Sequence, residues 1–99
     1  MKAAILYSKK KIKIQNLSVP PLERGQVLVK IFLSGICRSQ LMEYFGLRGK
    51  DKWLPHLFGH EAIGEVISVG PAVKKVKKRD RVILTWIKAK GLESNKISF

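Results

Sequence analysis

Two short segments carry the residues best suited to chemistry. His60 and Glu61 follow Gly59 and begin an apolar run that continues to Gly70, and the only cysteine, Cys37, lies at the end of another apolar run. A thiolate and an imidazole at two strand ends are the first two ligands of an open zinc site, and Glu61 adds a carboxylate beside them. The alternatives are a histidine that caps a strand edge and a cysteine with a buried structural role.

Short strands and one helix must position these residues. Alternating or apolar runs predict strands over 2–7, 11–15, 26–34, the stretch leading to Gly70, and 80–84. Because 26–34 is apolar on both faces, it is predicted to be a central, mostly buried strand. Residues Ser39–Phe45 suit a short helix that ends at Gly46. Cys37 then lies at or just before the helix N-terminus, where backbone N–H groups favour the thiolate.

The spacing of the turns indicates the fold class. Turn signals recur every eight to twelve residues and only one helix is predicted, which is typical of a mostly-β partial barrel. The 99 residues suit a single small domain over 1–99, in which about 85–99 form a poorly defined tail.

Composition limits the classes of protein. A single cysteine cannot form an internal disulfide and fits a reducing compartment. No apolar run reaches the roughly 18 residues of a membrane span, and the apolar part of the N-terminus is too short for a secretory signal. The prediction is a cytoplasmic protein without a membrane partner.

The net charge of +13 raises the question of nucleic acid. The basic residues cluster at Lys9–Lys11 and within 74–79, both of which are predicted turns, and aromatic residues do not alternate with them as a base-stacking surface requires. Solvated turn lysines explain this pattern, and no specific nucleic-acid partner is predicted. Nucleic-acid binding is kept as a third hypothesis that rests on charge alone.

The two chemical segments occur together in a recognisable order. Gly35-Ile36-Cys37-Arg38-Ser39, followed by Gly59-His60-Glu61 with Gly64, Gly70 and Val73, resembles the zinc-dependent medium-chain alcohol dehydrogenases. The resemblance runs from Met1 to about Leu84. It implies the N-terminal catalytic domain of that family, with its GroES-like fold, in truncated form.

The resemblance assigns roles to individual residues. It implies that Cys37 and His60 bind catalytic Zn²⁺, with Glu61 as a temporary third ligand. It also implies that Ser39 passes on the proton of a small alcohol substrate and that Arg38 contacts the coenzyme pyrophosphate. The reaction would interconvert alcohol and aldehyde with NAD(P). Catalytic residues are then Ser39, Cys37 and His60.

Parts of such an enzyme are absent from these 99 residues. No Gly-x-Gly-x-x-Gly occurs, and the family's usual third zinc ligand would lie beyond residue 99. NAD(P) is therefore expected only where a coenzyme domain is supplied, and the chain alone is predicted to be inactive. The runner-up is a non-catalytic GroES-like binding module, which would leave Cys37 and His60 without a shared purpose. Self-association through an exposed apolar face is also expected.

Predictions are made for three further positions, Gln40, Arg79 and His56. Gln40 stands where many relatives carry an aspartate that steadies the zinc-bound histidine, and its amide carbonyl can accept the same hydrogen bond. Arg79 stands where the family usually has glycine, so the turn before 80–84 is predicted to be strained or built differently. His56 is predicted to be a loop residue, because Pro55 and Gly59 make a helix improbable.

Overall fold

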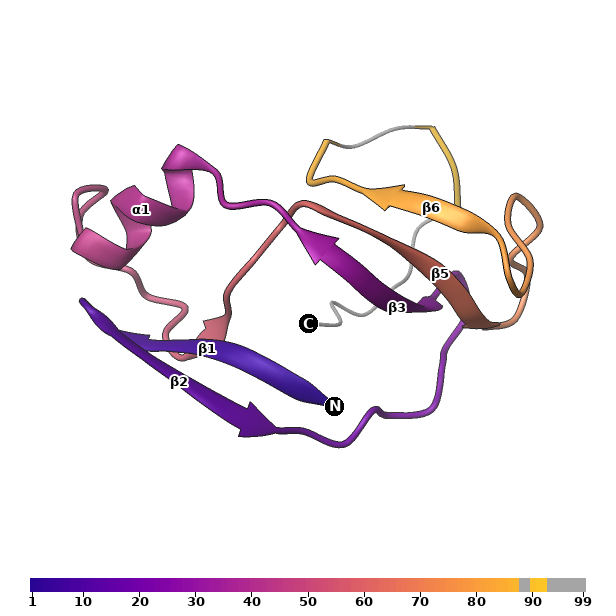
Figure 1. Ribbon diagram of the computed structural model, residues 1–99, viewed down its shortest axis with the longest axis horizontal. Helices are drawn as coiled ribbons and strands as arrows, with labels where there is room; N and C mark the ends of the chain where they lie inside the picture. Colours follow the sequence, from indigo (N-terminus) through magenta and orange to yellow (C-terminus); the bar gives the residue numbers. More distant parts are fainter. Residues whose placement is uncertain (88–89, 93–99) are drawn as a thin grey trace. The chain divides into compact units, whose positions relative to one another are not determined.

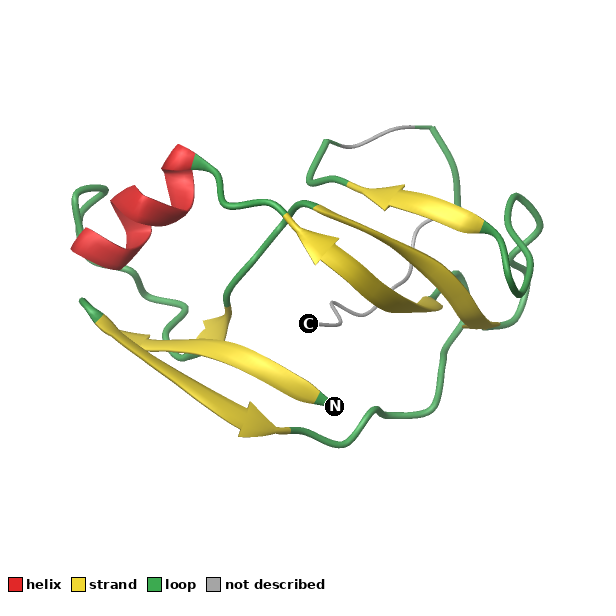
Figure 2. Cartoon of the chain, in the orientation of Figure 1, coloured by secondary structure: helices red, strands yellow, loops and turns green. Residues whose placement is uncertain are grey.

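The structure is a computed structural model that describes residues 1–87 and 90–92. Residues 88–89 and 93–99, which include most of the predicted tail, lie outside the described residues. The described chain is mostly β with one short helix, as predicted. In order, the elements are β1 (Lys2–Ser8), β2 (Lys11–Asn16), β3 (Val27–Ser34), α1 (Arg38–Phe45), β4 (His56–Leu57), β5 (Ala62–Val69) and β6 (Arg81–Leu84) (Figures 1 and 2).

Contacts within the chain define two compact units. The first is built from 1–19 and 36–59 and holds β1, β2, β4 and α1. The second is built from 20–35 and the described residues from His60 onward, and it holds β3, β5 and β6. The chain therefore passes between the units after Val19, Gly35 and Gly59. A single domain over 1–99 remains a prediction.

The first unit contains an antiparallel sheet in the order β2-β1-β4. β1 pairs with β2 through the predicted lysine turn and with β4 at its other edge, where Leu6 is the partner of His56. Two consecutive residues of β1, Ile5 and Leu6, are buried at 8% and 1% exposure, so this strand is covered on both faces at its centre. This unit fixes the position of α1, since the backbone N–H of Lys10 donates to the carbonyl of Tyr44 at 2.8 Å.

The second unit contains the antiparallel sheet β3-β5-β6, in which β5 is central (Figure 1). Val66 of β5 is fully buried. The prediction that 26–34 is a central, buried strand was wrong, because β3 lies at the edge and residues 30–34 are exposed. The apolar residues on both faces of β3 led to the prediction of a buried strand. Among the described residues, however, only β5 pairs with β3, which leaves its other edge without a strand.

The helix begins and ends close to the predicted residues. Cys37 is its N-cap in extended conformation, and Gly46 closes it at φ 67°, in the left-handed region that favours glycine. The N–H groups of Gly46 and Leu47 satisfy the carbonyls of Glu43 and Met42 at 3.0 and 2.8 Å. Within the described residues, no helix is long and apolar enough to cross a membrane.

The backbone at Arg79 is strained, as predicted for the turn before β6. Its φ is 78°, a left-handed conformation that costs a residue with a side chain about 1 kcal/mol or more. The turn is held because the N–H of Arg79 donates to the carbonyl of Val66 at 2.8 Å, and the N–H of Val66 donates to the carbonyl of Asp80 at 2.9 Å. The ladder between β5 and β6 therefore imposes the backbone angle that glycine would adopt without strain.

Candidate metal centre

Cys37 is positioned by the first turn of α1. Its Sγ accepts a hydrogen bond from the N–H of Ser39 at 3.4 Å and lies 3.0 Å from the hydroxyl oxygen of Ser39. The first turn of the helix contains no acidic side chain, so no carboxylate competes for its unpaired N–H groups. The helix N-terminus therefore stabilises negative charge on the sulfur, which is the form that binds metal.

Gln40 serves this N-cap, which differs from its predicted place beside a metal-bound histidine. Its side-chain Oε1 accepts from the N–H of Cys37 at 2.8 Å, and its own N–H donates to the carbonyl of Cys37 at 3.1 Å. This is a capping box in which cysteine replaces the usual serine or threonine. Gln40 is only 3% exposed, so the amide that orients Cys37 is itself fixed.

Arg38 and Ser39 occupy the first two positions of α1. Arg38 is exposed, and Ser39 is half-buried with its hydroxyl next to the Cys37 sulfur. A hydroxyl can both donate and accept a proton, so Ser39 has the chemistry of a relay at the edge of a thiolate. The coenzyme role of Arg38 stays a prediction.

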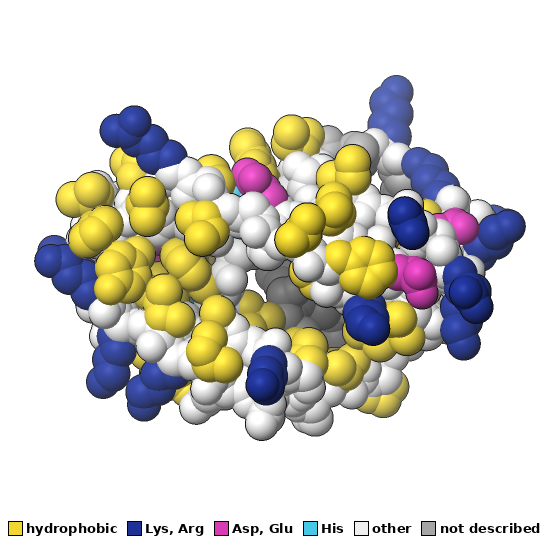
Figure 3. Space-filling view, viewed as in Figure 1, with side chains coloured by type: hydrophobic (Ala, Val, Ile, Leu, Met, Phe, Trp, Pro, Cys, Tyr) yellow, Lys and Arg dark blue, Asp and Glu magenta, His cyan; other side chains and the backbone are white. Residues whose placement is uncertain are grey.

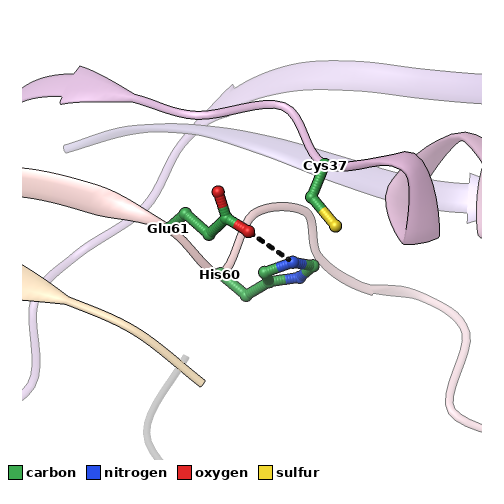
Figure 4. A group of neighbouring side chains, drawn as sticks. All are labelled: Cys37, His60 and Glu61. Atoms are coloured by element: carbon green, nitrogen blue, oxygen red, sulfur yellow. Dashed lines mark ion pairs between the residues drawn. The ribbon is translucent and has the colours of Figure 1, made fainter. Parts of the chain in front are cut away.

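His60 and Glu61 form a side-chain pair in the second unit. The Nε2 atom of His60 lies 3.6 Å from Oε1 of Glu61, and Figure 4 shows the carboxylate facing the ring. Both residues are half-buried. They stand immediately before β5, and the preceding Gly59 has φ 139°, which a residue with a side chain rarely adopts. The glycine thus permits the turn that presents the imidazole and the carboxylate together.

Two hydrogen bonds hold this pair at the end of the β3–β5 ladder. The carbonyl of Glu61 accepts from the N–H of Gly35 at 3.0 Å and from the hydroxyl of Ser34 at 3.1 Å. Cys37 lies two residues beyond Gly35, and consecutive Cα atoms are about 3.8 Å apart. The hydrogen bonds therefore fix the His60–Glu61 pair at the Gly35 end of the β3–β5 ladder, and Cys37 follows that end by two residues along the sequence.

A second polar pair was missed from the sequence. His56 is not a loop residue as predicted but forms β4 with Leu57, and its Nε2 lies 2.8 Å from Oδ2 of Asp51. The spacing of five residues across a loop gave no signal, because side chains five apart meet only when the loop turns back on itself. The prediction that no helix forms here was confirmed.

Comparison with known proteins identifies the family of the chain. The family model described as "Alcohol dehydrogenase GroES-like domain" matches residues 23–97. Sorbitol dehydrogenase of Bacillus subtilis (strain 168) is 39% identical over 84 residues, which cover 83% of this chain and 24% of that protein. An alcohol dehydrogenase of Geobacillus stearothermophilus is 40% identical over 88 residues, which cover 88% of this chain and 26% of that protein.

Solved structures show the same relationship. The crystal structure of 2R,3R-butanediol dehydrogenase from Bacillus subtilis is similar at a TM-score of 0.71 and 36% identity, over 83% of this chain and 26% of that one. The apo form of zinc dependent alcohol dehydrogenase 2 from Streptococcus pneumonia gives a TM-score of 0.73 at 27% identity, over 86% of this chain and 24% of that one. The chain spans about a quarter of the length of these relatives, and the predicted GroES-like fold is confirmed. The chain belongs to the alcohol dehydrogenase GroES-like domain family.

Proposed function

We propose that this chain is the zinc-binding part of the catalytic domain of an oxidoreductase that interconverts small alcohols and aldehydes with NAD(P). The observation that carries the proposal is the pair of anchored ligand segments. The Cys37 sulfur caps α1, and the His60–Glu61 pair is held at the end of the β3–β5 ladder by the hydrogen bond from Gly35, which precedes Cys37 by two residues in the sequence. The similar dehydrogenases support the reaction class.

The donor set fits zinc. Thiolate sulfur, imidazole nitrogen and carboxylate oxygen are the three ligand types that zinc takes in proteins, and a catalytic site leaves one position open. Bound zinc would polarise the substrate oxygen and lower the pKa of an alcohol. The chain's own residues would then hold the metal through Cys37 and His60, with Glu61 beside them. Ser39 would exchange the proton at its Oγ, next to the Cys37 sulfur.

Zinc titration of purified variants tests this proposal. Structural four-ligand sites bind zinc with about 10–16 kcal/mol, so one strong ligand contributes about 3 kcal/mol. We therefore expect Cys37→Ala and His60→Ala each to weaken zinc binding about a hundredfold in competition with a chromophoric chelator. The matched control is His56→Gln, which removes the other histidine and is expected to leave the affinity unchanged.

The outcomes of this titration are distinct. Equal zinc affinity in the unaltered chain and in both ligand variants would show that the metal site is misplaced. Loss of affinity in His56→Gln to the same degree would show that the imidazole of β4 takes part, which contradicts the assignment of His60. A Glu61→Gln variant should lose less than either strong-ligand variant, because a carboxylate beside the site is only a temporary ligand in this proposal.

An apolar row on the second unit supports self-association of the chain. Leu33 of β3 pairs with Ile63 of β5, and Ile63 pairs with Ile83 of β6, so the three side chains lie across one face. Their exposed fractions are 68%, 42% and 80%. Large apolar side chains that are exposed side by side are typical of a surface that binds another protein. We propose that, when no other protein is present, this surface binds a second copy of the chain.

Substitution of the row tests the proposed self-association. We expect Ile83→Lys to shift the chain from a concentration-dependent oligomer to a monomer in sedimentation velocity, because each copy would place a charge in the contact. Ile14→Lys is the matched control, since Ile14 is 67% exposed on β2 of the first unit and should leave the oligomer intact. A sedimentation coefficient that is independent of concentration in the unaltered chain would contradict the proposal.

The basic residues give no comparable support for nucleic-acid binding. Lys9 and Lys10 lie in the turn between β1 and β2, and the lysines within 74–78 lie between β5 and β6. On the face drawn in Figure 3, lysine and arginine side chains are scattered among hydrophobic and neutral ones. Their places in turns agree with the prediction of solvated turn lysines.

A further inference from the structure

The first unit contains a pocket that none of the proposed zinc ligands lines. Its volume is about 520 Å³, and it lies under the segment 46–55 that leads from α1 to β4. Glu43, Arg48, Asp51, Trp53 and His56 line it. Most of the lining residues belong to the segment 46–55. The contacts that hold this segment in place therefore also determine the shape of the pocket.

The Asp51–His56 pair ties the middle of this segment to β4. The Oδ2 atom of Asp51 lies 2.8 Å from Nε2 of His56, and its Oδ1 accepts from the N–H of Trp53 at 2.9 Å. The other ring nitrogen of His56, Nδ1, lies 2.8 Å from the carbonyl oxygen of Leu57. One carboxylate thus joins the middle of the segment to β4, which is fixed by its pairing with β1.

A doubly protonated ring suits this geometry best, because both ring nitrogens of His56 lie 2.8 Å from oxygen atoms. The carbonyl oxygen of Leu57 can only accept, so Nδ1 of His56 must carry a proton. An ionised Asp51 can also only accept, so Nε2 must carry a second proton. With Asp51 ionised, the imidazolium is the form of His56 that donates to both oxygens. A neutral ring would turn a lone pair toward one of two oxygens at 2.8 Å, and one hydrogen bond would become a repulsion.

Charged groups from the neighbouring elements also act on His56. Glu43 of α1 acts on His56 at longer range and is itself 3.3 Å from Arg48, which partly neutralises it. Lys50 is the other cation at the pocket. On β1 the residue paired with His56 is Leu6, which carries no charge. Asp51 is therefore the carboxylate in direct contact with the imidazolium.

We propose that Asp51 and His56 form a protonation-dependent clasp that holds the segment 46–55 around the pocket and releases it when His56 loses its proton. The clasp is separate from the zinc ligands, since His56 is four residues from His60 and bonds to Asp51 and Leu57. Release frees the carboxylate of Asp51, and with it Trp53, from β4. The pocket is thus closed at lower pH and loosened at higher pH.

The pKa values of His56 and Asp51 are shifted in the directions that favour the charged pair. Burial lowers the pKa of His56, but the hydrogen bonds to Leu57 and Asp51 and the charges of Asp51 and Glu43 outweigh it and raise the pKa above its ordinary 6.5. The N–H of Trp53 and the His56 ring hold the pKa of Asp51 below its ordinary 3.8. The clasp is therefore formed at pH values between the pKa of Asp51 and the pKa of His56, where Asp51 is ionised and His56 is protonated. It is lost as pH rises through the raised pKa of His56.

Two readouts on the full chain test the clasp. In a Trp86→Phe background Trp53 is the only tryptophan, so its fluorescence reports the segment, while NMR follows the imidazole of His56. The His56 signal is the one that disappears in His56→Gln. We expect the Trp53 emission to change with pH at the same midpoint as the His56 titration, and His56→Gln to abolish that change.

Two matched substitutions distinguish loss of the Asp51–His56 contact from the general effect of removing one negative charge from the protein. Asp51→Asn keeps an acceptor for the N–H of Trp53 but removes the charge, so both midpoints should move together to lower pH. Asp80→Asn changes another carboxylate that caps a turn, through the N–H of Lys77, and should move neither midpoint. Constant Trp53 emission through the His56 titration, an unmoved His56 midpoint in Asp51→Asn, or a persisting transition in His56→Gln would each overturn the proposal.

Discussion

Replacing Gly64 with alanine is expected to lower the free energy of unfolding by about 3 kcal/mol, the upper end of the usual cost of overpacking. A Cβ atom at this position would lie 2.3 Å from the carbonyl oxygen of Lys30 and 2.7 Å from Cγ1 of Val29. Both groups belong to β3, so the ladder between β3 and β5 must separate to admit a methyl group. Urea unfolding followed by circular dichroism measures the loss.

Gly35→Ala is the matched control for this substitution. Its added Cβ would meet Oε2 of Glu61 at 2.9 Å, which is the far end of a flexible side chain that can move aside. We expect a loss of about 0.5 kcal/mol, within the range of ordinary surface changes. Equal losses in the two variants would show that the close approach of β3 and β5 at Gly64 does not determine stability.

The chain by itself is expected to oxidise no alcohol measurably. Hydride transfer requires the nicotinamide to be held against the substrate, and holding two reactants in place corresponds to effective concentrations of about 10⁵–10⁸ M. No dinucleotide-binding glycine motif occurs in the 99 residues. The rate with small alcohols and either nicotinamide cofactor should therefore be at least about 10⁵-fold below that of a full-length relative.

The sorbitol dehydrogenase of Bacillus subtilis is a suitable positive control, because 84 of its residues match this chain at 39% identity. The assay follows reduced nicotinamide at 340 nm with zinc present. Turnover by the 99-residue chain within a few orders of magnitude of the control would show that its own residues supply cofactor orientation. Abolition of that turnover by Cys37→Ala would then place the reaction at the proposed metal centre.

Local signals predicted much of the fold. The C-terminal limit of α1 followed from the glycine stop at Gly46, and the predicted start at Ser39 is one residue after the observed start at Arg38. The β1–β2 hairpin followed from alternation across a lysine turn. The candidate ligands Cys37, His60 and Glu61 were chosen by type and order, because glycines and apolar runs mark strand ends wherever they occur, and their metal-binding role stays a prediction.

Features that depend on distant contacts were not predictable in the same way. The edge position of β3 depends on which strands pair with it, and its own residues do not specify that. Gln40 was predicted to accept a hydrogen bond from a zinc-bound histidine, whereas the Cys37-x-x-Gln40 spacing of a capping box could have indicated its contact with the N–H of Cys37. The Asp51–His56 pair depends on the path of a loop, for which periodicity carries no information.

The two units are interleaved along the chain, and this has a consequence for synthesis on the ribosome. β1 cannot complete its sheet until Leu57 is made, because Ile5 pairs with Leu57, and β3 waits for β5 in the same way. At about 5–20 residues per second, the interval between Ile5 and Leu57 is about 3–10 s. During that time the β1–β2 hairpin is marginally stable alone. A nascent chain of this protein therefore presents the apolar side of β1 to chaperones well before either unit can close.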